Sequence, residues 1–88
     1  MPPTAEAPAR TIVVVDFNGN DKEFHWRAEE LVRTLLHEAR AHLRVPADFP
    51  TALFNQAGRE LPEGETLRQA GVEPDALLVM RQVTVKGG

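Results

Sequence analysis

The stretch TIVVVDFNGNDKEFHWRA, residues 11–28, contains two strand patterns separated by a turn. Residues 11–17 are dense in β-branched side chains, which favours a strand buried on at least one face. The Asn-Gly pair in NGND, residues 18–21, tolerates the positive φ that a tight hairpin turn requires. In residues 22–28 two aromatic side chains alternate with charged or polar ones, so the two kinds fall on opposite faces. We therefore predict an antiparallel β-hairpin.

After the hairpin the apolar period changes from two to about 3.6 residues, which predicts a helix over residues 28–44. Its apolar stripe is broad enough to cover a sheet and consists of Val32, Leu36, Ala39 and Leu43, widened by Leu31 and Leu35. Glu29 and Glu30 are expected in the first turn, where carboxylates complement the positive end of the helix dipole. Arg40 and Arg44 are expected in the last turn, before a proline ends the helix.

The remaining sequence predicts short strands and turns. Residues 52–55 form an apolar run typical of a third strand, and a turn at Ala57 and Gly58 leads into a very short strand. Residues 66–71 are expected to make a single helical turn. Residues 76–85 are β-rich, with Leu77 and Val79 on one face and Leu78 and Met80 on the other. A hairpin, a helix and further strands in this order predict an α+β fold of the β-grasp type, in which a small mixed sheet wraps around one helix.

We expect three segments along the chain. Residues 1–10, rich in Pro and Ala, are predicted to be a flexible leader because they offer too little apolar surface to offset ordering. Residues 11–81 would form the β-grasp domain, and residues 82–88 an extended C-terminal tail that ends in Gly-Gly.

Composition narrows the class of function. The net charge of −3, from 13 acidic and 10 basic residues, argues against a nucleic-acid partner. The chain has no Cys, which excludes a disulfide framework and a thiol nucleophile. No apolar run is long enough to span a membrane and no signal-peptide pattern opens the chain, so we expect a cytoplasmic protein without a membrane partner.

The sequence from the third strand onward, LFNQAGRELPEGETLRQAGVEPDALLVM followed by RQVTVKGG, resembles the second half of ubiquitin. The likeness lies in the AG turn with a following Arg59, the spacing from Leu61 through Gly64 to Leu67, the closing strand and the Gly-Gly end. The first half agrees in layout, so the resemblance covers about residues 11–88. The chain departs from ubiquitin by a longer stretch between Pro46 and Gly58 and by a tail about two residues longer. Its Arg-rich, Lys-poor character is similar to that of prokaryotic, including bacterial, ubiquitin-like proteins.

The resemblance implies a protein modifier with no enzymatic activity of its own. An activating enzyme would use ATP to adenylate the Gly88 carboxylate, which would pass to an enzyme cysteine as a thioester and then to an amine of a target protein. A conjugating enzyme and a deconjugating isopeptidase are the further partners, and the free protein is expected to be a monomer. No cofactor is expected on the chain itself.

The tail would have to reach a distant active site. Seven residues after Arg81 could span about 23 Å at roughly 3.3 Å per residue. Gly87 and Gly88 lack Cβ and so fit a slot too narrow for a side chain. The residues expected to contact the activating enzyme as an extended strand are Gln82, Val83, Thr84, Val85 and Lys86. The resemblance places a specificity arginine of ubiquitin near Gln82 or Thr84, where this chain has none, which favours a dedicated activating enzyme.

Ubiquitin is recognised through an apolar patch on its sheet, and the resemblance places Leu53 or Phe54, with Met80 and Leu78, on the matching surface. The longer loop leaves the register of the third strand open by one residue, and such a slip exchanges the two faces. The alternative is that these side chains complete the core.

Other polar residues do not form a recognisable site. His37 and His42 are five residues apart, about 140° around a helix, so they cannot bind one metal ion as i and i+4 ligands would, and with His25 they are expected to be solvated. Acidic residues near the hairpin turn, Asp16, Asp21 and Glu23, lack an orienting His or a Gly-rich cradle, which favours a solubilising role. Lys22 is the expected internal branch point if chains form, because the enzyme would engulf Lys86, the other lysine.

Two other functions fit the same pattern. A sulfur carrier shares the fold, the Gly-Gly end and the adenylation step but ends as a thiocarboxylate. A plain β-grasp binding domain would have an inert terminus. The longer tail and the expected patch favour the modifier over the sulfur carrier, and the coincidence of the Gly-Gly end with the β-grasp layout favours it over an inert terminus.

Overall fold

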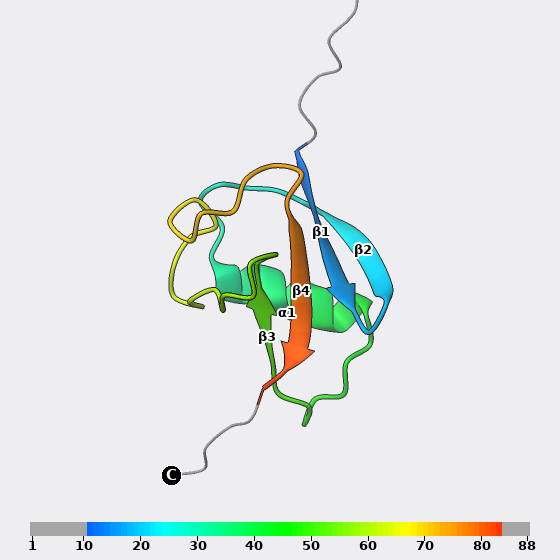
Figure 1. The fold of residues 1–88 in the computed structure, drawn as a ribbon. Coiled ribbons are helices and arrows are strands. Elements are labelled where there is room, and N and C mark those ends of the chain that lie inside the picture. The colour runs from blue at the N-terminus through cyan, green and yellow to red at the C-terminus, as the bar shows by residue number, and fades with distance from the viewer. Residues whose placement is uncertain (1–10, 84–88) are drawn as a thin grey trace, which may run out of the picture.

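The computed structural model describes residues 11–83, and the elements below belong to that part of the chain. Its elements are β1 (Ile12–Phe17), β2 (Asn20–His25), α1 (Val32–His42), β3 (Thr51–Phe54) and β4 (Leu77–Gln82). The strands form a mixed sheet in the order β2-β1-β4-β3, in which β1 and β4 are parallel and the other neighbours antiparallel. α1 crosses one face of this sheet, as Figure 1 shows. The predicted β-grasp arrangement is confirmed.

The hairpin of β1 and β2 forms as predicted. Asn18 and Gly19 are its two turn residues, with φ of 54° and 87°, and Phe17 pairs directly with Asn20. Positive φ at both central residues gives the turn whose twist matches that of the strands it joins. Glycine is required at position 19 because a side chain with Cβ rarely adopts that φ. The local sequence therefore determines the register of the first two strands.

The core lies between the sheet and α1. Strand alternation turns Val13, Val15 and Phe24 toward the helix, and all three are buried. The helix contributes the buried part of its predicted stripe, which is Val32, Leu35, Leu36 and Ala39. Leu61, Leu67 and Val72, from the connection between β3 and β4, complete the same cluster. A single apolar cluster thus joins all five elements, as expected for a domain of this size.

The helix begins four residues later than predicted, at Val32 instead of residue 28. The preceding backbone pairs with the connection between β3 and β4: Leu67 N–H donates to Glu30 O at 2.8 Å, and Arg68 N–H to Ala28 O at 3.1 Å. Val32 N–H donates in turn to Glu65 O at 2.8 Å. The first helical N–H groups are thus satisfied by a distant segment, which offsets the loss of a side-chain cap. No acidic residue lies in the first turn of α1, so the dipole role predicted for Glu29 and Glu30 is wrong.

The helix also ends two residues earlier than predicted. α1 ends at His42, and Arg44 has a φ of 58°, which is outside the helical region. Arg40 lies in the last turn, as predicted, whereas Arg44 follows the helix.

The later elements differ from the predictions in extent. β3 begins at Thr51 and ends at Phe54, one residue earlier than predicted at each end. The very short strand predicted after Gly58 is reduced to an isolated bridge between Phe54 and Glu60. Residues 66–71 form a turn, in which Ala70 N–H donates to Thr66 O at 2.9 Å. The predicted leader, residues 1–10, lies outside the described part of the chain.

Glu30 is a buried carboxylate beside the start of α1, with a side chain that is 6% exposed. Burial, and then the nearby carboxylate of Glu38, raise the pKa of Glu30, while the guanidinium of Arg27 opposes that rise. Arg27 Nη1 lies 3.5 Å from Glu30 Oε1, but Glu30 Oε2 has no hydrogen-bond partner. The charged form of Glu30 is therefore less favourable in the folded chain than in the unfolded chain.

We expect Glu30→Gln to increase the free energy of unfolding at pH 7. A raised pKa in the folded state means that the folded chain binds the proton more readily, so ionised Glu30 destabilises the fold above that pKa. This penalty disappears as the pH falls below the ordinary pKa of glutamate, and the gain from the substitution should disappear with it. Thermal unfolding of both proteins at pH 7 and at about pH 3 measures this.

Glu29→Gln is the matched control, because the Glu29 side chain is 79% exposed and its contact with Arg68 is a surface ion pair of 3.8 Å. Such pairs contribute little, so this substitution should change stability little at either pH. A loss of stability in Glu30→Gln at pH 7 would contradict the prediction.

Candidate functional site

The predicted partner-binding patch is wrong for three of its residues. Leu53, Leu78 and Met80 are each 1% exposed and belong to the core. Leu53 pairs directly with Met80, and this register turns both side chains toward α1. The alternative, that these residues complete the core, is the one the structure supports. Phe54, the next residue along β3, lies on the opposite face and is half-buried.

The face of the sheet opposite α1, called the outer face below, carries a different apolar group. It is formed by Phe54 of β3, Leu77 and Val79 of β4, and Val14 of β1. Val79 pairs with Phe54 and Leu77 with Val14, so the four side chains are adjacent. Leu77 is 38% exposed, and every other large apolar side chain within residues 11–83 is less exposed than that. The outer face thus offers a small apolar surface at the centre of the sheet.

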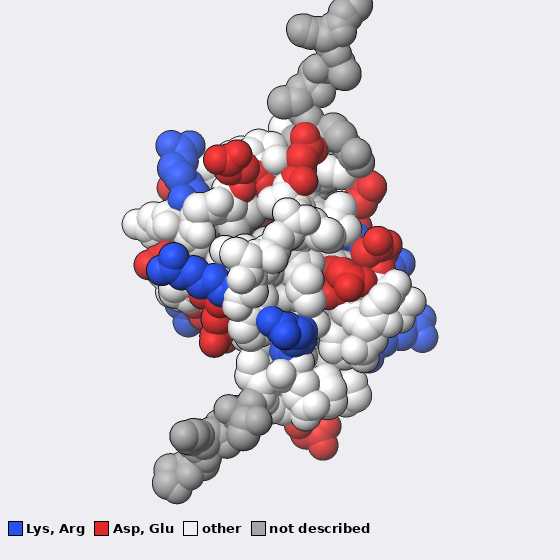
Figure 2. All heavy atoms as spheres, in the orientation of Figure 1, with Lys and Arg blue, Asp and Glu red and all other residues white. Residues whose placement is uncertain are grey.

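Charged groups border this apolar surface. Arg81, on the outer side of β4, places its guanidinium carbon 4.4 Å from the centre of the Phe54 ring, a cation–π contact. On the other side, Asp16 of β1 pairs directly with Asp21 of β2, and Glu23 pairs with Val14. Figure 2 views this face: uncharged atoms cover much of its middle, a basic side chain lies near the centre and acidic side chains lie toward the right. The surface therefore has a polar rim of both signs, as protein interaction sites commonly do.

Two acidic residues of the hairpin are strand partners. Asp16 and Asp21 face each other as like charges across two strands. Among residues 11–83 no three His, Asp or Glu side chains are placed to hold a metal ion. α1 is too short and too polar to span a membrane, and no other described helix could do so.

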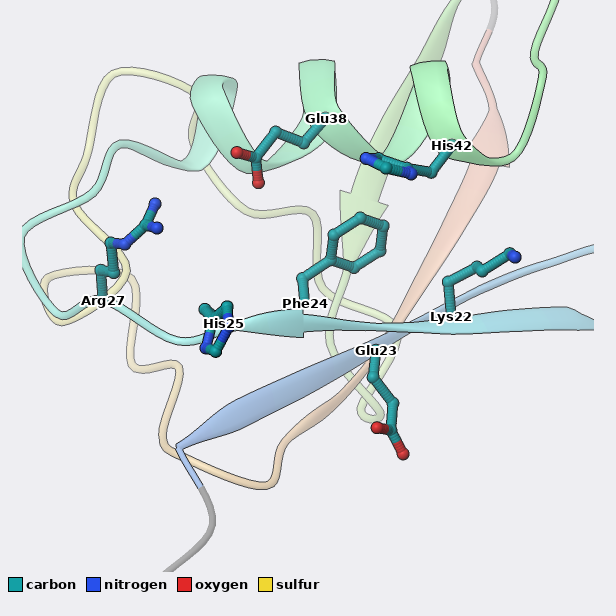
Figure 3. A pocket seen from close by; sticks show the side chains of 7 residues that line it. All are labelled: Lys22, Glu23, Phe24, His25, Arg27, Glu38 and His42. Atoms are coloured by element: carbon teal, nitrogen blue, oxygen red, sulfur yellow. The ribbon is translucent and has the colours of Figure 1, made fainter.

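A shallow groove of about 240 Å³ separates β2 from α1. Figure 3 shows Lys22 and Phe24 extending from β2 toward the helix, and Glu38 and His42 extending from the helix toward the strand. The rings of Phe24 and His42 meet edge to face with their centres 5.6 Å apart. His25 and His42 both line this groove, whereas His37 is exposed elsewhere on α1. Both basic and acidic side chains line the groove.

Lys22, the predicted branch point, is exposed at the edge of the sheet. β2 is an outer strand in the order β2-β1-β4-β3, so within residues 11–83 no further strand lies beside it. Its role in chain formation stays a prediction.

The end of β4 is the point where the described chain leaves the domain. Gln82, which the sequence placed in the tail, is the last residue of β4 and pairs with Thr51. Val83 N–H donates to Pro50 O at 3.0 Å, so two of the predicted tail residues are held by the domain. The other predicted tail residues, Thr84, Val85, Lys86, Gly87 and Gly88, lie outside the described residues.

The parallel pairing of β1 with β4 separates the two ends of the described chain. β1 begins at one end of the sheet and β4 ends at the other, as Figure 1 shows. Residue 83 therefore leaves the domain far from residue 11. The outer face lies beside this exit, because Arg81 and Val79 precede it on β4.

No family model and no curated protein matches the chain. Solved structures do match it. Ubiquitin of Caldiarchaeum subterraneum is 25% identical, with a TM-score of 0.71 over 88% of this chain and 98% of that one. A protein designed on the basis of ubiquitin is 17% identical, with a TM-score of 0.75 over 93% of this chain and 99% of the design. A chain in the crystal structure of ATBAG1 in complex with HSP70 is 13% identical, with a TM-score of 0.69 over 81% of this chain and 39% of that one.

A pair of neighbouring substitutions tests the assignment of the two faces. Leu78→Ala removes a side chain that is 1% exposed and should cost about 2–5 kcal/mol of unfolding free energy. Leu77→Ala removes a side chain that is 38% exposed and should cost less than about 1 kcal/mol. Chemical denaturation of the two variants measures both values. Equal losses would contradict the register of β4 described above.

Proposed function

We propose that this chain, a ubiquitin-like protein with the β-grasp fold, is a protein modifier that is attached to its targets through Gly88. An activating enzyme adenylates the Gly88 carboxylate with ATP, and the acyl group passes to an enzyme cysteine as a thioester. A conjugating enzyme then transfers it to an amine of a target protein, and an isopeptidase removes it. The observation that carries the proposal is the combination of a ubiquitin-like fold with a Gly-Gly sequence shortly after its last strand.

The chemistry requires little of the modifier itself. A terminal carboxyl group is ionised at neutral pH, with a pKa of about 3.5, and can attack the α-phosphate of ATP directly. The bond from the carboxylate oxygen to phosphorus forms while pyrophosphate leaves. The chain must supply a slender acyl end and a surface that the enzymes can bind. Gly87 and Gly88 meet the first need because they carry no side chain.

The outer face is our candidate for that binding surface. Its apolar centre, formed by Phe54, Leu77, Val79 and Val14, lies on the strand that continues toward the exit at Val83. An enzyme bound there would have the start of the tail beside it. The cation–π contact of Arg81 with Phe54 keeps a positive charge at the border of this surface, which favours an enzyme surface with acidic groups facing it.

The modifier is expected to use enzymes of its own and to reside in the cytoplasm of a bacterium. No arginine stands at Gln82 or Thr84, where the resemblance places the specificity arginine of ubiquitin. Lys22 and Lys86 are the lysines of the sequence, which limits branching within the chain to Lys22.

Gly88→Val should leave thermal unfolding unchanged and abolish conjugation, because a β-branched side chain does not fit a slot shaped for glycine. The test incubates the protein with ATP, a sulfide source and the activating and conjugating enzymes encoded near its gene, followed by mass spectrometry. An isopeptide adduct at Gly88 supports the modifier. Replacement of one carboxylate oxygen by sulfur would instead show a sulfur carrier, and an unchanged mass would show a binding domain with an inert terminus.

Leu77→Ser with Val79→Ser should reduce the rate of conjugation at least about tenfold if the outer face binds the enzymes, since both side chains belong to its apolar centre. Glu63→Ser with Glu73→Ser is the control, since both residues are exposed and lie outside the sheet. Circular dichroism must show that all variants keep the fold. Unchanged conjugation by the Leu77 and Val79 variant would exclude this face as the binding surface.

A further inference from the structure

The connection between α1 and β3, residues 43–50, has few hydrogen bonds of its own. Val45 N–H donates to Arg40 O at 2.9 Å and Phe49 N–H to Pro46 O at 3.1 Å. Prolines at positions 46 and 50 lack an N–H, so they donate nothing. Carbonyl groups in this connection are therefore free to accept hydrogen bonds from another part of the chain or from water.

The guanidinium of Arg40 supplies these hydrogen bonds. Arg40 Nη1 donates to Phe49 O and to Thr51 Oγ1, each at 2.6 Å. Arg40 Nη2 donates to Pro46 O at 2.9 Å and to Ala47 O at 3.3 Å. The ion pairs found within residues 11–83 do not involve Arg40, so carbonyl and hydroxyl dipoles surround its charge. The guanidinium divides these four contacts between two nitrogens of a rigid, planar fork, whereas the ammonium group of lysine has three donors on one nitrogen and cannot reproduce the same arrangement.

This set of contacts reaches the exit of the C-terminal segment. Arg40 Nη1 binds the residues on both sides of Pro50, namely Phe49 and Thr51. The Pro50 carbonyl between them accepts the hydrogen bond from Val83 N–H at 3.0 Å. Thr51 is in addition the strand partner of Gln82. One side chain of the helix thus fixes the backbone that holds the last residue described.

Other contacts hold the same region, among them the pairing of β3 with β4. The rings of Phe17 and Phe49 meet edge to face with centres 6.0 Å apart and fix the Phe49 side chain. Leu53 and Met80 pair further along the sheet. Both would persist without Arg40, so the domain should still fold.

We infer that Arg40 is a positioning residue, which sets where and in which direction the chain leaves the domain toward Gly88. The inference rests on the proposed function, because the direction of exit matters when an enzyme must bind the domain and the terminus together. A fixed exit raises the effective concentration of the terminus in the active site of the bound enzyme. Arg40 does not contact the reacting atoms.

The first test is independent of any enzyme. In Arg40→Gln and Arg40→Lys, the Val83 amide should exchange with solvent at least about tenfold faster than in the unmodified chain, measured by NMR. The Trp26 amide, which donates to Thr11 O at 2.7 Å near the opposite end of the sheet, should be unaffected. Arg33→Gln is the matched control, since it removes the same charge from an exposed position of the same helix. Unchanged exchange at Val83, or an equal increase at Trp26, would overturn the inference.

The second test measures adenylation as ATP–pyrophosphate exchange with the activating enzyme that accepts the unmodified chain. Arg40→Gln should lower kcat about five- to tenfold and leave KM within about twofold, because the outer face remains intact. Arg33→Gln should change neither. An unchanged kcat in Arg40→Gln would overturn the positioning role while the proposed function stands. If the unmodified chain is not adenylated, the proposed function fails, and the exchange of the Val83 amide still decides whether Arg40 fixes the exit.

A rescue experiment separates positioning from a general loss of stability. Thr51 and Gln82 are strand partners whose side chains lie on the same face, and the chain contains no Cys. The double substitution Thr51→Cys with Gln82→Cys can be oxidised to a disulfide with glutathione disulfide. This disulfide should hold β3 and the end of β4 together without the guanidinium. Added to Arg40→Gln, the disulfide should restore both slow exchange at Val83 and kcat, and its reduction should reverse both. A formed disulfide that restores neither would overturn the inference.

Discussion

The parallel pairing of β1 with β4 joins the first and last strands of the described chain, and the rest of the structure depends on it. Val14 pairs with Leu77 and Val15 with Leu78, which aligns the inner and outer faces of the two central strands. The hairpin of β1 and β2 is local, and β4 is the only strand of residues 11–83 that neighbours β3 in the sheet. Without this one long-range pairing, the hairpin and the C-terminal half would have no common sheet for α1 to cover. Pairing β1 with β4 closes a long loop, and burial of the core must offset the entropy lost in that closure.

The same pairing determines how the surface can be used. α1 covers the inner face, and no element of residues 11–83 covers the outer face, which has Leu77 and Val79 at its centre. Because the two strands are parallel, the end of β4 lies at the end of the sheet opposite to the start of β1. The connection that precedes β3 lies at this end, where the Pro50 carbonyl binds Val83. The binding surface and the exit that we propose are therefore consequences of a single topological feature.

Several elements could be predicted because their signals are local. Asn18 and Gly19 specify a turn through their tolerance of positive φ, and this determines the register of the hairpin. The helical period gives the buried face of α1 correctly. The start of α1 could not be predicted, because Glu30 and Val32 form hydrogen bonds with residues more than thirty positions away. Glu30, which was predicted in the first turn of the helix, is therefore a buried carboxylate that precedes α1. The predicted patch was wrong for a similar reason, because the strand pattern does not say which of two apolar faces the helix will cover.

By itself, the sequence determined the identity of the elements, the β-grasp class and the alternation of Leu77 and Val79 against Leu78 and Met80. These depend on the period of apolar side chains and on the φ preferences of single residues, which are properties of neighbouring positions. Only the tertiary structure decided which of those faces is buried, where α1 begins, and that Arg40 binds the backbone beside Pro50. Those outcomes depend on pairing between segments far apart in the chain. The free energy of such pairing is shared over the whole core, so no short stretch of sequence encodes it.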